Sequence, residues 1–170
     1  MLRPYKVGVL SDTHMPRMAK KLPYELLKGL ENSDLIIHAG DWSDWSVYEA
    51  LRELAPVEGV AGNADGKEIQ ERLGLSKLLL IEGCRIGVVH GHGNKGTTEK
   101  RALSAFTSQN VDCIIFGHSH IPLLKEVGGV LLFNPGSPTD KRRQSQYSYG
   151  IIEIESGEIY ARHVYYDHKH

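Results

Sequence analysis

The sequence predicts an α/β fold with two β-sheets, and three observations support this. Up to about residue 116, apolar runs alternate with stretches of helical spacing, the pattern of strands joined by helices. From residue 123 onward the chain holds only strand-like runs separated by glycine-containing turns. No repeat or linker interrupts residues 1–170, so we expect a single domain. These patterns predict a parallel-dominated sheet first and an antiparallel sheet later.

The first strand and helix follow from local sequence. The apolar run 5–10 predicts a strand, because short apolar runs bounded by turn residues suit strands covered on both faces. Pro16 and Pro23 exclude a continuous helix over the basic stretch 15–21. Leucines then recur near helical spacing, which predicts a helix at 23–31.

The later elements are predicted by the same reasoning. In chain order they are a strand at 34–41, a helix ending before Pro56, a strand at 57–61, a helix at 67–73, strands at 77–81 and 85–89, a helix at 97–109, and strands at 111–116, 123–127, 130–133, 147–154 and 158–165. Glu82-Gly83 predicts a hairpin turn. Leu103 and Phe106 are the expected core contacts of the last helix.

Charge and composition limit the classes of function. The chain has 20 Lys and Arg against 21 Asp and Glu, which argues against non-specific binding to duplex nucleic acid. A small phosphate-bearing substrate is not excluded, because a metal site can supply positive charge locally. Cys84 and Cys113 lie in apolar runs and are expected to be buried thiols. Without a leader-like or membrane-spanning segment, we expect a cytoplasmic protein with no membrane partner; a homo-oligomer stays open.

Side chains that can bind metals follow five of the predicted strands. They lie in Asp12-Thr13-His14, Gly40-Asp41, Gly62-Asn63, His90-Gly91-His92 and Gly117-His118-Ser119-His120. In an open α/β sheet such strand ends border the crevice where ligands bind. Each motif alone fits an ordinary turn, a core histidine or surface histidines. All five together predict one metal site centred on Asp41.

The set of donors suits two divalent ions that share one carboxylate. Oxygen and imidazole ligands without thiolate favour Mn²⁺, with Ni²⁺, Fe²⁺, Co²⁺ or Zn²⁺ as alternatives, over Mg²⁺ and Ca²⁺. Two such ions about 3.5–4 Å apart can hold a bridging hydroxide and a phosphoryl group. They also stabilise the charge that develops during in-line displacement. The chemistry therefore needs no Ser or Cys nucleophile.

The order of these motifs resembles the calcineurin-like metallophosphoesterases, whose pattern is D-x-H, G-D, G-N-H-[DE], a lone H and G-H-x-H, each after a strand. The resemblance spans about residues 5–165 and implies a four-layer αββα sandwich of two mixed β-sheets. It implies these ligand roles: Asp12, His14 and His120 for one metal, Asn63, His90 and His118 for the other, and Asp41 as the bridge.

The sequence departs from the family pattern at Ala64, where the family has a histidine that assists catalysis or protonates the leaving group. Asp44 takes the second carboxylate position of the common G-D-x-x-D form. The short length, the H-G-H motif and the loop 134–137 (N-P-G-S) resemble the small single-domain phosphodiesterase branch. That branch is also similar to the retromer scaffold subunit of eukaryotes, in which the fold serves binding.

The predicted function is that of a metal-dependent phosphodiesterase acting on a small phosphodiester substrate. The alternatives are a non-catalytic protein-interaction scaffold of the same fold and a small-metabolite phosphomonoesterase. Every expected ligand is present, which favours an enzyme over a scaffold. The missing histidine at Ala64 weakens the monoesterase alternative, because alkyl leaving groups benefit from protonation.

Further side chains outside the main ligand set could take part in catalysis or substrate binding. Asn63 and His92 are the candidate catalytic side chains, although a solvent-facing His92 is the competing interpretation. His38 is expected to support the ligands rather than to bind metal. The last three histidines, His163, His168 and His170, are expected to have no catalytic role. Residues 141–143 (K-R-R) predict a solvated turn, but a basic loop there could contact a substrate phosphate.

Overall fold

The computed structural model describes residues 3–170, in which ten strands and four helices form the fold. Their bounds are β1 (Tyr5–Leu10), α1 (Tyr24–Leu30), β2 (Leu35–His38), α2 (Ser46–Arg52), β3 (Val57–Gly59), α3 (Lys67–Leu73), β4 (Ser76–Ile81), β5 (Cys84–Val89), α4 (Thr98–Ser104), β6 (Cys113–Ile115), β7 (Leu123–Val127), β8 (Val130–Asn134), β9 (Tyr147–Glu155) and β10 (Glu158–Tyr166). Every predicted element is present, with bounds shifted by a few residues.

The strands form two five-stranded sheets, ordered β10-β9-β1-β2-β3 and β4-β5-β6-β8-β7. In the first sheet β1, β2 and β3 are parallel, and β9 and β10 are antiparallel additions. In the second, β5, β6 and β8 are parallel between the antiparallel edges β4 and β7. Both sheets are therefore mixed, as the family resemblance implied.

The expected division into an early parallel sheet and a later antiparallel sheet is wrong. β9 pairs with β1 across the register Val7↔Ile152, so the end of the chain completes the sheet that its beginning started. The physical reason is burial on both faces of β9, whose residues 148–152 are all buried. Such a strand needs a neighbour along each edge and a packed layer on each side.

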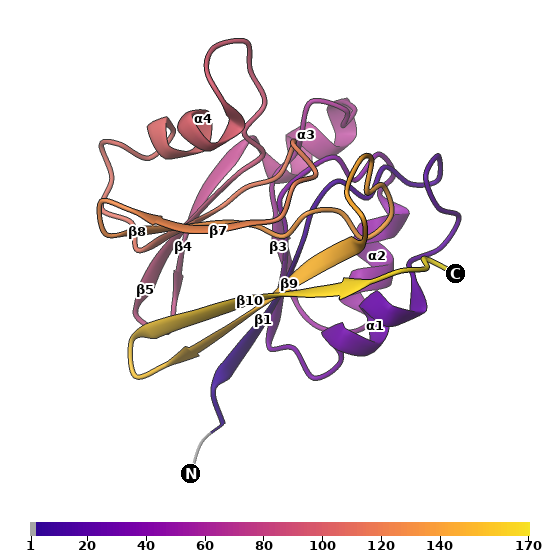
Figure 1. Ribbon diagram of the computed structural model, residues 1–170, viewed down its shortest axis with the longest axis horizontal. Coiled ribbons are helices and arrows are strands. Elements are labelled where there is room, and N and C mark those ends of the chain that lie inside the picture. Colours follow the sequence, from indigo (N-terminus) through magenta and orange to yellow (C-terminus); the bar gives the residue numbers. More distant parts are fainter. Residues whose placement is uncertain (1–2) are drawn as a thin grey trace.

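Three apolar clusters define four layers (Figure 1). Between the sheets pack residues of both, among them Val9, Ile37, Ile115 and Phe133. Helices α1, α2 and α3 cover the outer face of the β1 sheet, where their clustered side chains are Leu26, Leu30, Val47, Leu51, Ile69 and Leu73. Helix α4 and the residues after it cover the other sheet through Ala102 and Phe106. The predicted αββα sandwich is confirmed.

Helix α4 is shorter than predicted, since it ends at Ser104 rather than near residue 109. Thr97 caps its start by accepting the N–H of Lys100. Beyond the helix, turn-type hydrogen bonds take over, and the Thr107 hydroxyl donates to the carbonyl of Ser104 at 3.0 Å. Such a side-chain bond competes with continued helix. Phe106 is nevertheless buried as expected, whereas Leu103 is only partly buried.

The structure also bears on the cysteines and on the length of the helices. Cys84 and Cys113 are buried, and neither is in a disulfide. Among residues 3–170, no helix combines the length and the apolar character needed to cross a bilayer.

Candidate metal centre

The predicted ligands lie at the carboxyl ends of parallel strands, on backbone turns of unusual conformation. Ten non-glycine residues in 3–170 have a positive φ. Half of them are predicted ligands, namely Asp12, His14, Asp41, His118 and His120, with φ between 45° and 71°. This conformation is unfavourable for non-glycine residues and is retained where the surroundings enforce it, commonly at functional sites.

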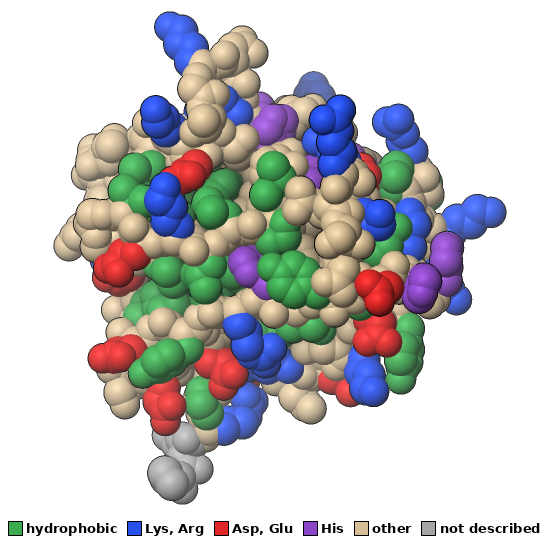
Figure 2. Space-filling view, viewed as in Figure 1, with side chains coloured by type: hydrophobic (Ala, Val, Ile, Leu, Met, Phe, Trp, Pro, Cys, Tyr) green, Lys and Arg blue, Asp and Glu red, His purple; other side chains and the backbone are tan. Residues whose placement is uncertain are grey.

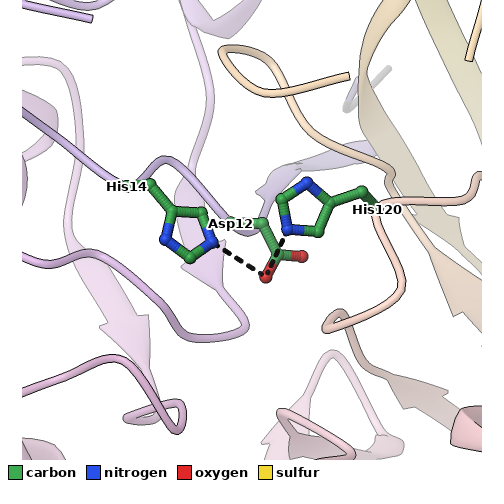
Figure 3. Close-up of side chains that lie close together, drawn as sticks. All are labelled: Asp12, His14 and His120. Atoms are coloured by element: carbon green, nitrogen blue, oxygen red, sulfur yellow. Dashed lines mark ion pairs between the residues drawn. The ribbon is translucent and has the colours of Figure 1, made fainter. Parts of the chain in front are cut away.

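The first group of ligands is Asp12, His14 and His120 (Figure 3). Both imidazole rings point toward one carboxylate oxygen, Asp12 Oδ1, which lies 3.8 Å from His14 Nε2 and 3.6 Å from His120 Nε2. The two rings stack with their centroids 5.2 Å apart. The other oxygen, Asp12 Oδ2, accepts the backbone N–H of His118 at 3.0 Å. One oxygen of Asp12 is thus used for structure and the other faces the histidines.

The second group contains Asp41, His90 and His118. His90 Nε2 lies 3.1 Å from Asp41 Oδ2. The predicted fourth member, Asn63, places its Oδ1 atom 3.2 Å from His118 Nδ1. Neighbouring donors of an octahedral ion with bonds of about 2.1 Å lie about 3 Å apart, so both spacings suit one ion.

Asp41 joins the two groups. Its Oδ2 atom lies 3.1 Å from His90 Nε2 and 3.4 Å from His14 Nε2, which belong to different groups. Its Oδ1 atom accepts the backbone N–H of Ala64 at 2.8 Å, which fixes the orientation of the carboxylate. Gly62 makes room for it, because a Cβ there would lie 2.2 Å from Asp41 Oδ1. This arrangement brings together the residues expected around a shared carboxylate.

Unpaired polar atoms show that these residues fit metal ions. In the described part of the chain five buried side-chain atoms lack a hydrogen-bond partner, and four of them are Asp12 Oδ1 and the Nε2 atoms of His14, His90 and His120. His90 Nδ1 donates to the carbonyl of Ala39 at 2.8 Å, and His120 Nδ1 donates to the carbonyl of Asp140. With protons on Nδ1, the Nε2 lone pairs face the centre, as in metal-bound histidines.

The electrostatics of the centre favour a cation. Burial raises the pKa of Asp12 to about 7. Burial acts to lower the pKa of His90, but the carboxylates of Asp41 and Asp12 outweigh it and raise that pKa to about 9. Burial is also the main cause that lowers the pKa values of His118 and His120 to about 4. The buried carboxylate of Asp12 thus needs nearby positive charge, while most of the histidines stay neutral and able to coordinate.

Asp65 is a functional residue that sequence reasoning missed. Its buried carboxylate accepts the backbone N–H groups of Asp41 at 2.8 Å, Gly62 at 2.7 Å and Ser43 at 2.8 Å. Burial raises its pKa in spite of these donors. Asp65 therefore fixes the turn that carries Asp41. The signal was available, since Asp65 occupies the acidic position of the G-N-H-[DE] motif.

The loop after β8 supports the first group of ligands. Ser137 Oγ donates to the carbonyl of Asp12 at 2.8 Å, and Thr139 Oγ1 donates to the carbonyl of Thr13 at 2.6 Å. The carbonyl of Asp140 accepts the Nδ1–H of His120. The sequence marked this loop only as a feature of one branch, so its role as a support was also missed.

His38 supports the neighbouring turns, in keeping with its expected role. Its Nδ1 accepts the N–H of Gly40 at 3.1 Å, so Nε2 carries the proton and donates to Thr13 Oγ1 at 3.1 Å. The ring also stacks on Trp42 at a centroid distance of 3.9 Å. Burial lowers the pKa of His38 well below its usual value. With both ring nitrogens bonded, neither is free to bind a metal.

His92, Ala64 and Asp44 lie around the groups rather than in them. His92 is exposed, and its ring centroid is 5.6 Å from that of His90 and 6.4 Å from that of His118. Ala64 is exposed next to Asn63. Asp44 is also exposed, and it accepts the N–H of Ser46 at the start of α2. His163 belongs to neither group of ligands, and its Nε2 donates to the carbonyl of Asn134 at 2.7 Å.

Known proteins resemble this chain along most of its length. A probable metallophosphoesterase of Methanothermobacter thermautotrophicus is 37% identical over 80% of this chain and 78% of its own. The phosphodiesterase MJ0936 of Methanocaldococcus jannaschii is 30% identical over 77% and 82%, respectively. Among solved structures, wild-type Vps29 of Entamoeba histolytica, complexed with Zn²⁺, superimposes with a TM-score of 0.75 at 27% identity, covering 94% of this chain and 98% of that one.

The family match agrees with these similarities. Residues 5–157 match the calcineurin-like phosphoesterase superfamily domain, and this range contains both groups of predicted ligands. The predicted kinship with small phosphodiesterases is confirmed by the relatives, and Vps29 is a structural neighbour. The chain therefore belongs to the calcineurin-like phosphoesterase superfamily, as a probable metallophosphoesterase with two clusters of His and Asp side chains.

Proposed function

We propose that the protein hydrolyses small phosphodiesters in the cytoplasm with two divalent ions, of which Mn²⁺ is the preferred metal. One observation carries this proposal: four buried side-chain atoms lack hydrogen-bond partners, and three of them, the Nε2 atoms of His14, His90 and His120, lie within 3.8 Å of the fourth, Asp12 Oδ1. A buried polar atom without a partner costs free energy, so its retention indicates a ligand.

The ligand roles follow from the two groups. Asp12, His14 and His120 would hold one ion, and Asn63, His90 and His118 the other, with Asp41 shared. Such ions supply a hydroxide nucleophile at neutral pH and neutralise the charge of the phosphoryl group during its transfer. Histidine-rich donor sets favour Mn²⁺, Fe²⁺, Co²⁺, Ni²⁺ or Zn²⁺ over the strongly hydrated Mg²⁺.

The protein's own side chains complete the site on its open side. Asn63 and His92 are both exposed next to buried ligands, where they can contact a bound diester. Arg101 holds the loop that carries His92, since its Nε donates to the carbonyl of Gly91 at 2.8 Å and its Nη1 to that of Gly96 at 2.7 Å. His92 is therefore positioned beside the centre rather than left on a free loop.

Relatives support a diesterase. The relatives MJ0936 and YfcE carry the name phosphodiesterase, and a similar solved structure is described as a novel archaeal phosphodiesterase. The exposed methyl group of Ala64 offers no proton to a leaving group, which fits esters with good leaving groups better than alkyl monoesters. The resemblance to Vps29 keeps a protein-binding scaffold as the second candidate, and metal-dependent turnover distinguishes the two.

The test compares metal-stripped protein with protein reloaded with Mn²⁺ or Mg²⁺, using bis(4-nitrophenyl) phosphate and 4-nitrophenyl phosphate. We expect no turnover after stripping, recovery with Mn²⁺ above that with Mg²⁺, and a preference for the diester. Metal content is measured in parallel and should approach two ions per chain. Full activity in chelator, or protein that binds two ions without hydrolysing either ester, would reject the proposed function.

A further inference from the structure

Three segments next to the first group of ligands form a strongly basic surface, which we call the basic shelf. It consists of residues 15–21, 140–143 and 167–170, which contain seven Lys or Arg, two Asp and no Glu in a chain of formal net charge −1. Its cations are Arg17, Lys20, Lys21, Lys141, Arg142, Arg143 and Lys169. In Figure 2, Lys and Arg side chains gather at the upper right, on the side of the C-terminus in Figure 1, whereas Asp and Glu are more frequent below.

Hydrogen bonds join the three segments into one surface. Lys169 Nζ donates to the carbonyl of Met18 in the first segment and to that of Thr139, next to the second, at 2.9 Å. The ammonium groups of Lys141 and Lys169 lie 5.6 Å and 5.7 Å from the centroid of the same ring, that of Tyr147. A hollow of about 500 Å³, within the range of small-molecule sites, is lined by residues 16–21 and 169–170.

The basic shelf adjoins the metal centre directly. The N–H of Met18 donates to the carbonyl of His14 at 2.9 Å, and His120 donates to the carbonyl of Asp140. The predicted ligands His14 and His120 are thus bonded to two of the three segments. Arg142, at φ 50°, is held in the left-handed region two residues beyond Asp140. An anion on the shelf would lie beside the diester bound at the centre.

None of the seven cations of the shelf forms an ion pair with a carboxylate of residues 3–170. Elsewhere Arg3 pairs with Asp34 at 2.7 Å, Lys77 with Glu58 at 3.1 Å and Lys125 with Glu99 at 2.8 Å. Seven cations held together with only two carboxylates repel one another, and a bound anion relieves that repulsion.

We propose that the basic shelf binds a second phosphate group of the substrate, so that the natural substrate is a small phosphodiester carrying an additional phosphate monoester. This inference rests on the proposed phosphodiesterase function and narrows its substrate class. A phosphate monoester brings a charge of about −1.5 to −2 and three acceptor oxygens, which Arg and Lys bind by charge-assisted hydrogen bonds. A diester without that group would use the metal centre alone.

The test uses two substrates with the same scissile bond and leaving group: thymidine 5′-(4-nitrophenyl phosphate) with and without a 3′-phosphate. With Mn²⁺-loaded protein, we expect the 3′-phosphate to lower KM about tenfold while kcat changes little, because the added contact is distant from the reacting atoms. At 1 M salt, where the Debye length is about 3 Å, this preference should disappear.

Matched variants assign the preference to the shelf. Lys20→Gln/Lys21→Gln changes two exposed side chains, so this variant should fold normally and abolish the KM preference without changing kcat on the unmodified diester. The control Lys28→Gln/Lys67→Gln removes two exposed charges from α1 and α3, and it should keep the preference.

The outcomes separate this inference from the proposed function. If both thymidine diesters are hydrolysed with equal KM values, the shelf does not bind a second phosphate, and the proposed phosphodiesterase function still stands. A preference lost equally in the control would overturn the inference as well, since general surface charge would then be the cause. If neither thymidine diester is hydrolysed, the proposed function fails and the inference falls with it.

Discussion

The carboxylate of Asp65 accepts the backbone N–H of Asp41 at 2.8 Å. The same oxygen accepts the N–H of Gly62, and the other accepts that of Ser43, so one buried side chain closes the turns after two neighbouring strands. The conformation of Asp41, at φ 62°, is unfavourable for a residue with a side chain. The position of the Asp41 carboxylate therefore depends on a residue that belongs to neither group of predicted ligands.

Asp65→Asn should weaken metal binding and the fold together. An amide can keep the acceptor oxygen for Asp41 and Gly62, but it then directs its NH₂ group at the N–H of Ser43. The lost bond should lower the free energy of unfolding by about 1–3 kcal/mol. Metal affinity should fall about 10–100-fold. Urea unfolding and a Mn²⁺ titration measure the two effects, and an unchanged affinity would show that Asp41 keeps its position without Asp65.

Asp41→Asn should strongly reduce the activity, whereas Asp44→Asn should leave it intact. Asp41 Oδ2 lies within 3.4 Å of ligands in both groups, whereas Asp44 is exposed and only accepts the N–H of Ser46. We expect the Asp41 variant to lose about 10²–10³-fold in rate and to bind less metal. The Asp44 variant should stay within about 0.5 kcal/mol of wild-type stability and near its rate. Equal metal content and rate in the two variants would remove Asp41 from the centre.

Ser137→Ala should affect the two ions unequally. The hydroxyl of Ser137 donates to the carbonyl of Asp12 and accepts the N–H of Asp140, so its loss leaves the buried carbonyl and the partly buried N–H without this partner at about 1–3 kcal/mol. Because Asp12 is grouped with His14 and His120 and only borders the second group, the titration should show the first site weakened more than the second. Exposed Ser145→Ala is the control. Equal weakening of both sites would argue for a general loss of stability instead.

The sequence predicted which side chains the fold brings together in two groups, because these residues directly follow apolar runs. Strand ends can be located from such runs, and parallel strands bring their carboxyl ends to one edge. Asp12, Asp41 and His90 are therefore placed by the local sequence. Residues that hold the ligands in place, such as Ser137, could not be predicted in this way. Ser137 lies 125 residues beyond Asp12 in the chain, and no sequence pattern indicates which distant group a loop hydroxyl will contact.

The pairing of the strands was only partly predictable for a related reason. The apolar sequence of β9 shows that it is a strand, but its side chains would suit either sheet. Its pairing with β1 is settled by packing: Ile152 lies in the cluster between the sheets, and Ile151 lies in the cluster beneath the helices. Only the assembled layers make these two faces distinct.

Ala64 gives the sharpest test of the chemistry. Its N–H donates to Asp41 Oδ1 at 2.8 Å, which anchors the backbone, while its side chain is exposed beside Asn63. With no imidazole there, wild-type rates should fall steeply as the pKa of the leaving group rises. Ala64→His should flatten this dependence by supplying a proton, which is worth about 10²–10⁴-fold for poor leaving groups.

The measurement is a series of aryl and alkyl diesters graded by leaving-group pKa, run on both proteins with equal metal content verified. The exposed position leaves space for the larger ring, so a variant with two bound ions is expected. A shallow slope already in wild type would mean that another side chain supplies the proton. His92 is then the first residue to replace, because its ring centroid lies 5.6 Å from that of His90. A steep slope that survives Ala64→His with full metal content would show that position 64 does not face the leaving group.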